Sequence, residues 1–271
     1  MRVAEALAQA RAQGLDRLDA QLLLAHRLAR PRAWLIAHDE DEIPDDQAQA
    51  YLDAVARRAD GVPLAHLVGE REFHGLRLAV GPAVLVPRPD TEVLVDWALA
   101  CLAGLIQPRV LDLGTGSGAI AVSVGHARPD AIVTATDIDA AALAVAQANA
   151  QTHSVAVEIQ QGSWWQPVAG RRFELILSNP PYIAADDPHL PALAHEPRHA
   201  LTPGGDGLDA LRVLAGGGTA HLVPGGHLLV EHGFDQGEPV RSLLAAAGLE
   251  DIATRRDLAG HERCSGGRRP A

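Results

Sequence analysis

The sequence predicts an α/β protein that contains a mostly parallel sheet and, before it, a small helical domain. Three observations lead to this expectation. Residues 1–68 place apolar side chains at helical spacing, residues 70–86 alternate apolar and polar side chains, and residues 109–255 alternate short apolar runs with helical segments. Strands separated by helices are typical of a parallel sheet, and ligands of such sheets bind where the strands end.

The first 68 residues are expected to form helices. Apolar residues from Val3 to Ala10 predict a helix that ends near Gly14, Asp16 is expected to cap a second helix that stops at Pro31, and residues 44–59 predict a third. The acidic run 39–42 is interpreted as a solvated loop, with partner binding as the alternative. Because no catalytic constellation occurs here, residues 1–68 are interpreted as a substrate-docking domain rather than a purely structural one.

Residues 70–86 have the pattern of a β-hairpin, with turn signals at Gly75 and at Gly81-Pro82. Residues 87–92, Pro-Arg-Pro-Asp-Thr-Glu, predict a rigid turn before a helix over 93–105. This turn is either a linker or a wall over an active site. The expected organisation is therefore a helical domain at 1–68, a β-hairpin linker at 69–89 and an α/β domain at 90–271.

The α/β domain is expected to contain strands at 110–113, 131–136, 155–159, 173–178, 227–231 and 251–255. Helices are expected over 119–126, 139–150, 208–214 and 236–247. The three glycines at 216–218 are expected to interrupt helical structure.

Composition narrows the class of protein. The 271 residues, 47% of them hydrophobic, suffice for one α/β domain and a smaller companion. All 23 basic residues are arginine, and the net charge of −11 argues against a surface that tracks nucleic-acid phosphates. Cys101 and Cys264 show no pairing pattern, which indicates a reducing compartment. With no leader pattern and no apolar run of membrane-span length, the cytoplasm is the expected location. The histidines have no metal-ligand spacing, so no metal is expected.

The tetrapeptide Asn179-Pro180-Pro181-Tyr182 follows the strand-like run 173–178. Its two prolines hold the chain extended and lack backbone N–H groups. The side-chain oxygen of Asn179 and the carbonyl of Pro180 would therefore offer acceptors with few competing donors, which suits a substrate that presents an NH2 group. Tyr182 adds an aromatic face against which a planar group can lie.

A glycine-rich turn, Gly114-Thr115-Gly116-Ser117-Gly118, follows the strand-like run that contains Asp112. Such a turn lets the backbone approach a ligand closely and presents free N–H groups at the start of a helix. The spacing of the glycines and Asp137 also fits a dinucleotide fingerprint. A carboxylate at Asp112 would repel a pyrophosphate, however, and would suit an ammonium group.

S-adenosylmethionine, which has an ammonium group, a ribose and no phosphate, therefore fits this turn better than a dinucleotide. Asp112 is expected near its ammonium, Asp137 on its ribose hydroxyls and Trp164 beside its adenine. Core packing is the alternative for Trp164, and an equal one for Trp165.

Taken together, the tetrapeptide and the run 112–118 resemble the class I amino-methyltransferases. The runs 87–92, 196–197, 204–208 and 231–233 make the chain more specifically similar to the release-factor glutamine methyltransferases, the PrmC/HemK family. The similarity covers nearly the whole chain. It implies a class I methyltransferase, Rossmann-like fold with a seven-stranded sheet.

The resemblance also implies methyl transfer from S-adenosylmethionine to the side-chain amide nitrogen of the glutamine in the Gly-Gly-Gln motif of class I bacterial release factors. Its cofactor residues fall on Gly114 to Gly118, Asp137, Trp164 and Asn179, and its substrate residues on Asn179 to Tyr182. Asn179, Pro180 and Tyr182 are the expected catalytic residues. The protein is expected to be a monomer that binds neither membrane nor nucleic acid.

Two departures from the family pattern stand out. Ser163 occupies a position that is commonly acidic, which puts the contact to the adenine amino group in question. Glycines in the tail 262–269 are expected to weaken the last strand. The alternatives are an amino-methyltransferase that acts on adenine or guanine in RNA or DNA and, from another class, a dinucleotide-binding module.

Overall fold

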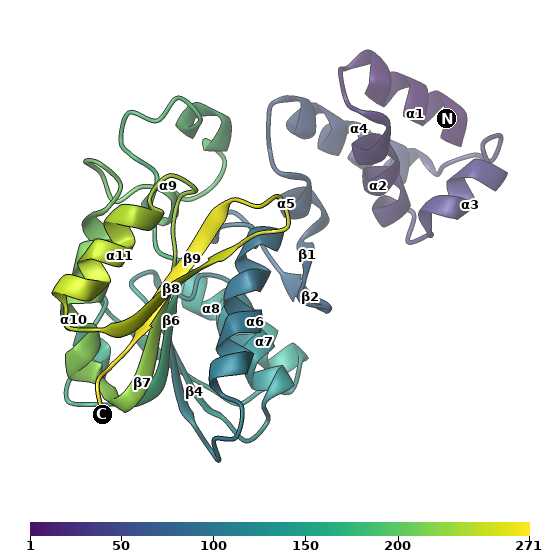
Figure 1. Cartoon of the computed structure of the whole chain (residues 1–271). Coiled ribbons are helices and arrows are strands. Elements are labelled where there is room, and N and C mark those ends of the chain that lie inside the picture. Colours follow the sequence, from purple (N-terminus) through teal and green to yellow (C-terminus); the bar gives the residue numbers. More distant parts are fainter. The chain divides into compact units, whose positions relative to one another are not determined.

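The computed structural model describes residues 1–271 and divides into two compact units, Met1–Glu70 and Arg71–Ala271 (Figure 1). Each unit has a hydrophobic core of its own. The candidate site lies entirely within the second unit.

The first unit is helical. Its helices are α1 (Val3–Ala12), α2 (Arg17–Arg27), α3 (Arg32–Ala37), α4 (Asp45–Ala59) and α5 (Leu64–Val68). The Asp16 side chain accepts a hydrogen bond from the Asp19 N–H and so caps α2 as predicted. The sequence interpretation missed α3 and α5. Each begins directly after a proline, Pro31 or Pro63, whose restricted φ favours the start of a helix as well as the end of the one before.

A hairpin of β1 (Glu70–Phe73) and β2 (Leu76–Ala79) turns at His74-Gly75. The predicted continuation of strand structure beyond residue 79 is wrong. The Asn149 side chain accepts from the Ala79 N–H at 2.7 Å and donates to the Ala79 carbonyl at 3.0 Å, which ties the end of β2 to a helix of the second unit. Val84 and Val86 are nevertheless buried, as their apolar character requires.

The central sheet has seven strands in the order β5-β4-β3-β6-β7-β9-β8. The first five are parallel to one another, whereas β9 runs antiparallel to both of its neighbours. This arrangement confirms the predicted mostly parallel sheet of seven strands. The strands are β3 (Arg109–Leu113), β4 (Ile132–Asp137), β5 (Val157–Gln161), β6 (Phe173–Ser178), β7 (Leu222–Glu231), β8 (Glu250–Arg256) and β9 (Glu262–Arg268).

Helices cover both faces of the sheet, as Figure 1 shows. On β3, Val110 points into the core beneath α6, α7 and α8, while Leu111 points into the core beneath α10 and α11. The remaining elements are α6 (Glu92–Cys101), α7 (Ala119–Ala127), α8 (Ala140–Thr152), α9 (Arg198–Leu201), α10 (Asp209–His221), α11 (Gly237–Ala246) and the 3-10 turns η1 (Pro89–Thr91), η2 (Gln166–Val168) and η3 (Leu190–Leu193). No helix is long and apolar enough to cross a membrane.

The glycines at 216–218 were wrongly predicted to interrupt a helix, and the glycines of the tail 262–269 do not prevent strand β9 from forming. Helix α10 continues through residues 216–218. Two of these positions leave no room for a side chain, since a Cβ on Gly217 would lie 2.2 Å from Nε1 of Trp165 and one on Gly218 would lie 2.8 Å from Leu228. Strand β9 is paired along both edges, and a Cβ on its Gly266 would lie 2.3 Å from Leu229. At these positions glycine permits close packing and does not interrupt the element.

Candidate active site

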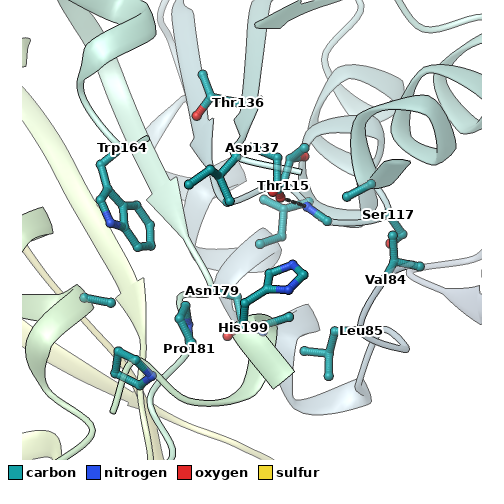
Figure 2. Close-up of a pocket in the computed structure, with 18 of the residues that line it drawn as sticks. Val84, Leu85, Thr115, Ser117, Thr136, Asp137, Trp164, Asn179, Pro181 and His199 are labelled. Atoms are coloured by element: carbon teal, nitrogen blue, oxygen red, sulfur yellow. Dashed lines mark hydrogen bonds between the residues drawn. The ribbon is translucent and has the colours of Figure 1, made fainter. Parts of the chain in front are cut away.

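A pocket of about 450 Å³ opens at the carboxyl ends of the parallel strands. The turns after β3, β4, β5 and β6 all contribute to it, as expected for ligand sites of doubly wound sheets. Figure 2 shows Trp164 on one side and Val84 with Leu85 on the other, with Asp137, Asn179 and His199 between them. The structure therefore brings the predicted glycine turn and the Asn-Pro-Pro-Tyr turn to one cavity.

The glycine turn is bent by backbone conformations that favour glycine. Gly114, Gly116 and Gly118 have φ values of 71°, 55° and 80°. The N–H groups of Gly114 and Thr115 both donate to the Thr136 carbonyl at 2.9 Å, which fastens the turn to the end of β4. Gly114, Thr115, Gly116 and Ser117 line the pocket, whereas Gly118 lies behind it. A Cβ on Gly118 would be 3.0 Å from the Ala146 Cβ, so this glycine lets α7 approach α8.

Asp112, predicted to hold an ammonium group, lies beneath the glycine turn and is not part of the pocket lining. Its Oδ2 accepts from the Thr115 hydroxyl at 2.6 Å and from the Ala121 N–H at 3.2 Å. Complete burial raises the pKa of Asp112 to about 7, although these two donors oppose the rise. Both contacts fasten the turn to the start of α7, whereas Oδ1 of Asp112 has no hydrogen-bond partner. The expected contact between Asp112 and an ammonium group stays a prediction.

Asp137 lies at the end of β4 and lines the pocket. Its Oδ2 accepts from the Gly116 N–H at 2.9 Å and its Oδ1 from the Asp139 N–H at 3.0 Å (Figure 2). Each carboxylate oxygen keeps further acceptor capacity. Asp137 therefore orders the glycine turn and can also accept from hydroxyl groups in the pocket.

Trp164 borders the pocket from the turn after β5, and Ser163 lines it beside Trp164. Trp164 has a φ of 45°, a left-handed conformation that is unusual for a bulky residue. A Cβ on Gly114 would be 3.7 Å from the Trp164 ring, so the indole lies against the first glycine of the turn. Trp165 instead points away into packing, where its indole donates to the Val213 carbonyl and stacks on His221.

Asn179 follows β6 and lines the pocket. Its Nδ2 donates to Oγ1 of Thr91 at 3.1 Å. Its Oδ1 is screened from solvent and has no hydrogen-bond partner. A buried amide oxygen without a donor is costly, by about 1–3 kcal/mol, so this atom requires an explanation.

The other residues of the tetrapeptide divide between the pocket and the core. Pro181 lines the pocket, whereas Pro180 is buried and does not, so the role of its carbonyl stays a prediction. Tyr182 also lies outside the lining, in contrast to the predicted contact with a planar group. Its hydroxyl donates to Oε1 of Glu231 at 3.1 Å, and burial raises its pKa. The ring is thereby held against the core beneath the turn.

The turn 87–92 was interpreted as either a linker or a wall over an active site. Its residues Pro87, Arg88 and Thr91 line the pocket, together with the preceding residues 83–85. The buried side chain of Glu196 accepts from the Val86 N–H at 2.8 Å and forms an ion pair with Arg88. This contact joins two of the motifs that carry the family resemblance, Glu196-Pro197 and the Pro-Arg-Pro turn. Thr91 belongs to the same wall.

Several lining residues were not singled out from the sequence. His199, on the short helix α9, lines the pocket, and its Nε2 lies 3.6 Å from Oδ2 of Asp139. The motif Glu196-Pro197, which directly precedes α9, was the signal from which a place for His199 near the pocket could have been predicted. Thr91 was visible only as part of its motif. The pocket contains no group of three or more His, Cys, Asp or Glu side chains that could hold a metal ion, and neither does the rest of the chain.

Two family models match the chain. The "PrmC N-terminal domain" matches residues 2–69, and the "Methyltransferase small domain" matches residues 91–208. Among solved structures, a methyltransferase from Pyrococcus furiosus is 18% identical with a TM-score of 0.53, covering 81% of this chain and 99% of that one. The T. thermophilus 16S rRNA N2 G1207 methyltransferase, solved with S-adenosylmethionine and guanosine, is also 18% identical, with a TM-score of 0.55 over 74% of this chain and 49% of that one. These likenesses establish the methyltransferase fold.

Curated relatives are similar along almost their entire length. The release factor glutamine methyltransferase of Bordetella pertussis is 54% identical over 257 residues, which cover 94% of this chain and 95% of the relative. The same enzyme of Xylella fastidiosa (strain Temecula1) is 48% identical with 98% of both chains covered, and that of Escherichia coli (strain K12) is 44% identical with 97% and 96% covered. The glycine turn and the Asn-Pro-Pro-Tyr turn meet at one pocket, and these relatives are 44–54% identical over nearly the whole chain. The chain therefore belongs to the family of release factor glutamine methyltransferases.

Proposed function

We propose that this chain transfers a methyl group from S-adenosylmethionine to the side-chain amide nitrogen of the glutamine in the Gly-Gly-Gln motif of class I peptide-chain release factors. Family membership supports the release-factor glutamine as acceptor. The observation that carries the assignment of residues concerns Asn179, which lines the pocket and whose Oδ1 has no hydrogen-bond partner. An acceptor left without a donor suits a substrate that brings its own N–H.

The donor set of the pocket fits S-adenosylmethionine. The turn 114–117 offers a close backbone approach without any basic side chain that would call for a phosphate. Asp137 and Trp164 both line the pocket, which supports assigning the ribose hydroxyls to Asp137 and the adenine to the indole of Trp164. Ser163 offers a hydroxyl where the family commonly has a carboxylate. When bound here, S-adenosylmethionine supplies an electrophilic methyl group.

The residues around Asn179 then have one task, which is to hold a weak nucleophile. The lone pair of an amide nitrogen is delocalised into its carbonyl, and methylation places positive charge on that nitrogen. The Asn179 oxygen accepts one amide N–H, orients the nitrogen and stabilises the developing charge without reorganising. The Pro180 carbonyl is assigned the second N–H. The methylated nitrogen then loses a proton to water, so no dedicated base is assigned.

The partner and setting follow from the same proposal. The helical unit, residues 1–68, docks the release factor, and the hairpin at 69–89 leads into the catalytic domain at 90–271. The enzyme acts as a monomer in the cytoplasm and does not bind nucleic acid directly. The net charge of −11 supports the last point, since nucleic-acid affinity rests mainly on basic side chains.

The test uses the purified chain with labelled S-adenosylmethionine and three acceptors: a class I release factor, its Gly-Gly-Gln variant with the glutamine replaced by alanine, and ribosomal RNA. We expect label only in the unmodified release factor, with mass spectrometry placing one methyl group on the glutamine side chain. Label in the alanine variant or preferential label in the RNA would overturn the proposal. Binding of S-adenosylhomocysteine but not of a nicotinamide dinucleotide, measured by calorimetry, is expected alongside.

A further inference from the structure

The backbone carbonyl of Tyr182 is the point at which the Asn-Pro-Pro-Tyr turn is attached to the segment after β7. Pro180 and Pro181 have no N–H, so the turn has few donors of its own through which the fold could hold it. Instead, Nε2 of Gln236 donates to the Tyr182 carbonyl at 2.9 Å. Gln236 does not line the pocket, and the mechanism above assigns it no role.

The side-chain amide of Gln236 has a definite orientation. Its Oε1 accepts from the Gly233 N–H at 2.9 Å, while its Nε2 donates to the Tyr182 carbonyl. A backbone N–H can only donate and a backbone carbonyl can only accept, so a reversed amide would lose both contacts. The donor that faces Tyr182 is therefore determined by backbone groups and does not depend on where a hydroxyl proton lies.

The backbone from which the Gln236 side chain extends is itself held in place. Its N–H donates to the Gly233 carbonyl at 2.9 Å, and its carbonyl accepts from the Val240 N–H in α11 at 3.0 Å. The Gly233 carbonyl also lies 2.8 Å from Nδ1 of His232, which is fully buried. Gln236 therefore reaches Tyr182 from a fixed position between the end of β7 and the start of α11.

Tyr182 has two further contacts that restrict its position. Its hydroxyl donates to Oε1 of Glu231 at 3.1 Å, so the segment 231–236 holds both the side chain and the carbonyl of Tyr182. On the other side of this carbonyl lies Gly207, which has a φ of 81°. A Cβ on Gly207 would lie 2.3 Å from the Tyr182 oxygen and 3.0 Å from Nε2 of Gln236. The absence of a side chain at Gly207 leaves the space that the carbonyl occupies.

We propose that Gln236 and Gly207 are positioning residues which fix the Tyr182 carbonyl and thereby the place of the Asn179 side-chain oxygen in the pocket. Two prolines with fixed φ angles separate Asn179 from Tyr182, so a shift of the carbonyl is passed on to Asn179. A misplacement of about 1 Å can cost about a hundredfold in rate. This inference rests on the proposed function and adds to it the contacts that position its catalytic turn.

The first test is Gln236→Glu, which keeps the shape of the side chain and the acceptor for Gly233 but removes the donor to Tyr182. At pH 8 the introduced carboxyl is ionised and can only accept, so its contact with the Tyr182 carbonyl is lost. Loss of one neutral hydrogen bond corresponds to about 2- to 12-fold, and we expect kcat to fall by about tenfold. Affinity for S-adenosylhomocysteine, measured by calorimetry, should stay unchanged, because Gln236 and Tyr182 lie outside the pocket lining.

Gln151→Glu is the matched control, because it makes the same change at an exposed position of α8. It should leave both kcat and cofactor affinity unchanged. Equal kcat values for Gln236→Glu and Gln151→Glu would overturn the inference. A loss of cofactor affinity in Gln236→Glu as large as its loss of kcat would also overturn it, since that result indicates general damage to the site.

The second test, Gly207→Ala, displaces the same carbonyl from the other side. The Tyr182 oxygen would have to move by about 1 Å to make room for the Cβ, so kcat should fall by about a hundredfold. Gly204→Ala is the matched control, because Gly204 has a similar φ of 91° but its Cβ would meet nothing within 4 Å. Its kcat should stay within about twofold of wild type. Equal kcat values for the two folded variants would refute the role of Gly207, and if Gly207→Ala does not fold, Gln236→Glu decides.

A measurement without substrate keeps this inference separate from the proposed function. The side-chain NH2 signals of Asn179, identified by their absence in Asn179→Ala, report on the position of the turn, because Nδ2 donates to Oγ1 of Thr91 at 3.1 Å. These signals should shift in Gln236→Glu and stay in place in Gln151→Glu. Unchanged signals in Gln236→Glu would refute the positioning role whether or not release factors are methylated. Failure of wild type to methylate a release factor would instead refute the function.

Discussion

Gly217→Ala is expected to damage both the fold and the cofactor site, although alanine is the better helix former. Gly217 lies within α10 directly over the Trp165 indole. An added Cβ would lie 2.2 Å from Nε1 and 2.5 Å from Cε2 of that ring. The ring cannot easily yield, because Nε1 donates to the Val213 carbonyl at 3.0 Å and the indole stacks on His221 with centroids 4.6 Å apart.

The magnitude follows from opposing effects. Alanine in a helix gains about 1 kcal/mol over glycine. Overpacking costs about 1–3 kcal/mol, and loss of the indole hydrogen bond adds about 0.5–1.5 kcal/mol. We therefore expect Gly217→Ala to lower the free energy of unfolding by about 0.5–3.5 kcal/mol. Gly216→Ala is the matched control, since its Cβ would meet nothing within 4 Å, and it should raise that free energy by about 0.5–1 kcal/mol.

Urea unfolding followed by circular dichroism measures both variants, and calorimetry measures their affinity for S-adenosylhomocysteine. Because Trp164 precedes the displaced indole and lines the pocket, Gly217→Ala should also weaken cofactor binding, whereas Gly216→Ala should not. Two variants with equal stability and equal affinity would refute the packing explanation for the glycines of α10.

The remaining predictions concern carboxylates. Asp137→Ala should weaken binding of S-adenosylhomocysteine by about 10- to 150-fold in calorimetry, since hydrogen bonds to a charged group are lost; an effect no larger than that of the exposed Asp186→Ala would contradict the assignment. Burial raises the pKa of Asp112 from 3.8 to about 7, so between these pH values the folded state holds a proton that the unfolded state has lost. The free energy of unfolding should therefore fall as the pH rises from about 5 to 7, by at most about 1.4 kcal/mol per pH unit. Urea unfolding of Asp112→Asn should show a shallower decline, and an unchanged slope would refute this.

The elements that were predictable from sequence are those whose local pattern and packing agree. Strand β6 was predicted with the bounds that the structure has, because residues 173–178 form a short, mostly apolar run before a proline pair. The cap at Asp16 and the glycine turn are likewise local signals. These features depend on neighbours in the chain, which the sequence displays directly.

The features that were missed depend on partners distant in sequence. Whether Gly217 ends a helix or accommodates an indole depends on Trp165, 52 residues earlier, and no helix propensity contains that information. Tyr182 was expected in the pocket, but its hydroxyl donates a hydrogen bond to Glu231, 49 residues later, and the Tyr182 ring lies behind the turn. Thr91 accepts a hydrogen bond from the side chain of Asn179, 88 residues later, and the residues next to Thr91 in the sequence do not indicate this contact.

The central claim is that the free oxygen of Asn179 holds the substrate amide nitrogen during methyl transfer. Single-turnover methylation of a release factor by Asn179→Ala, with cofactor saturating, tests it most directly. The loss of one preorganised polar partner predicts a rate at least about a hundredfold below wild type, with the fold intact by circular dichroism. A folded Asn179→Ala enzyme that methylates the glutamine at nearly the wild-type rate would contradict it.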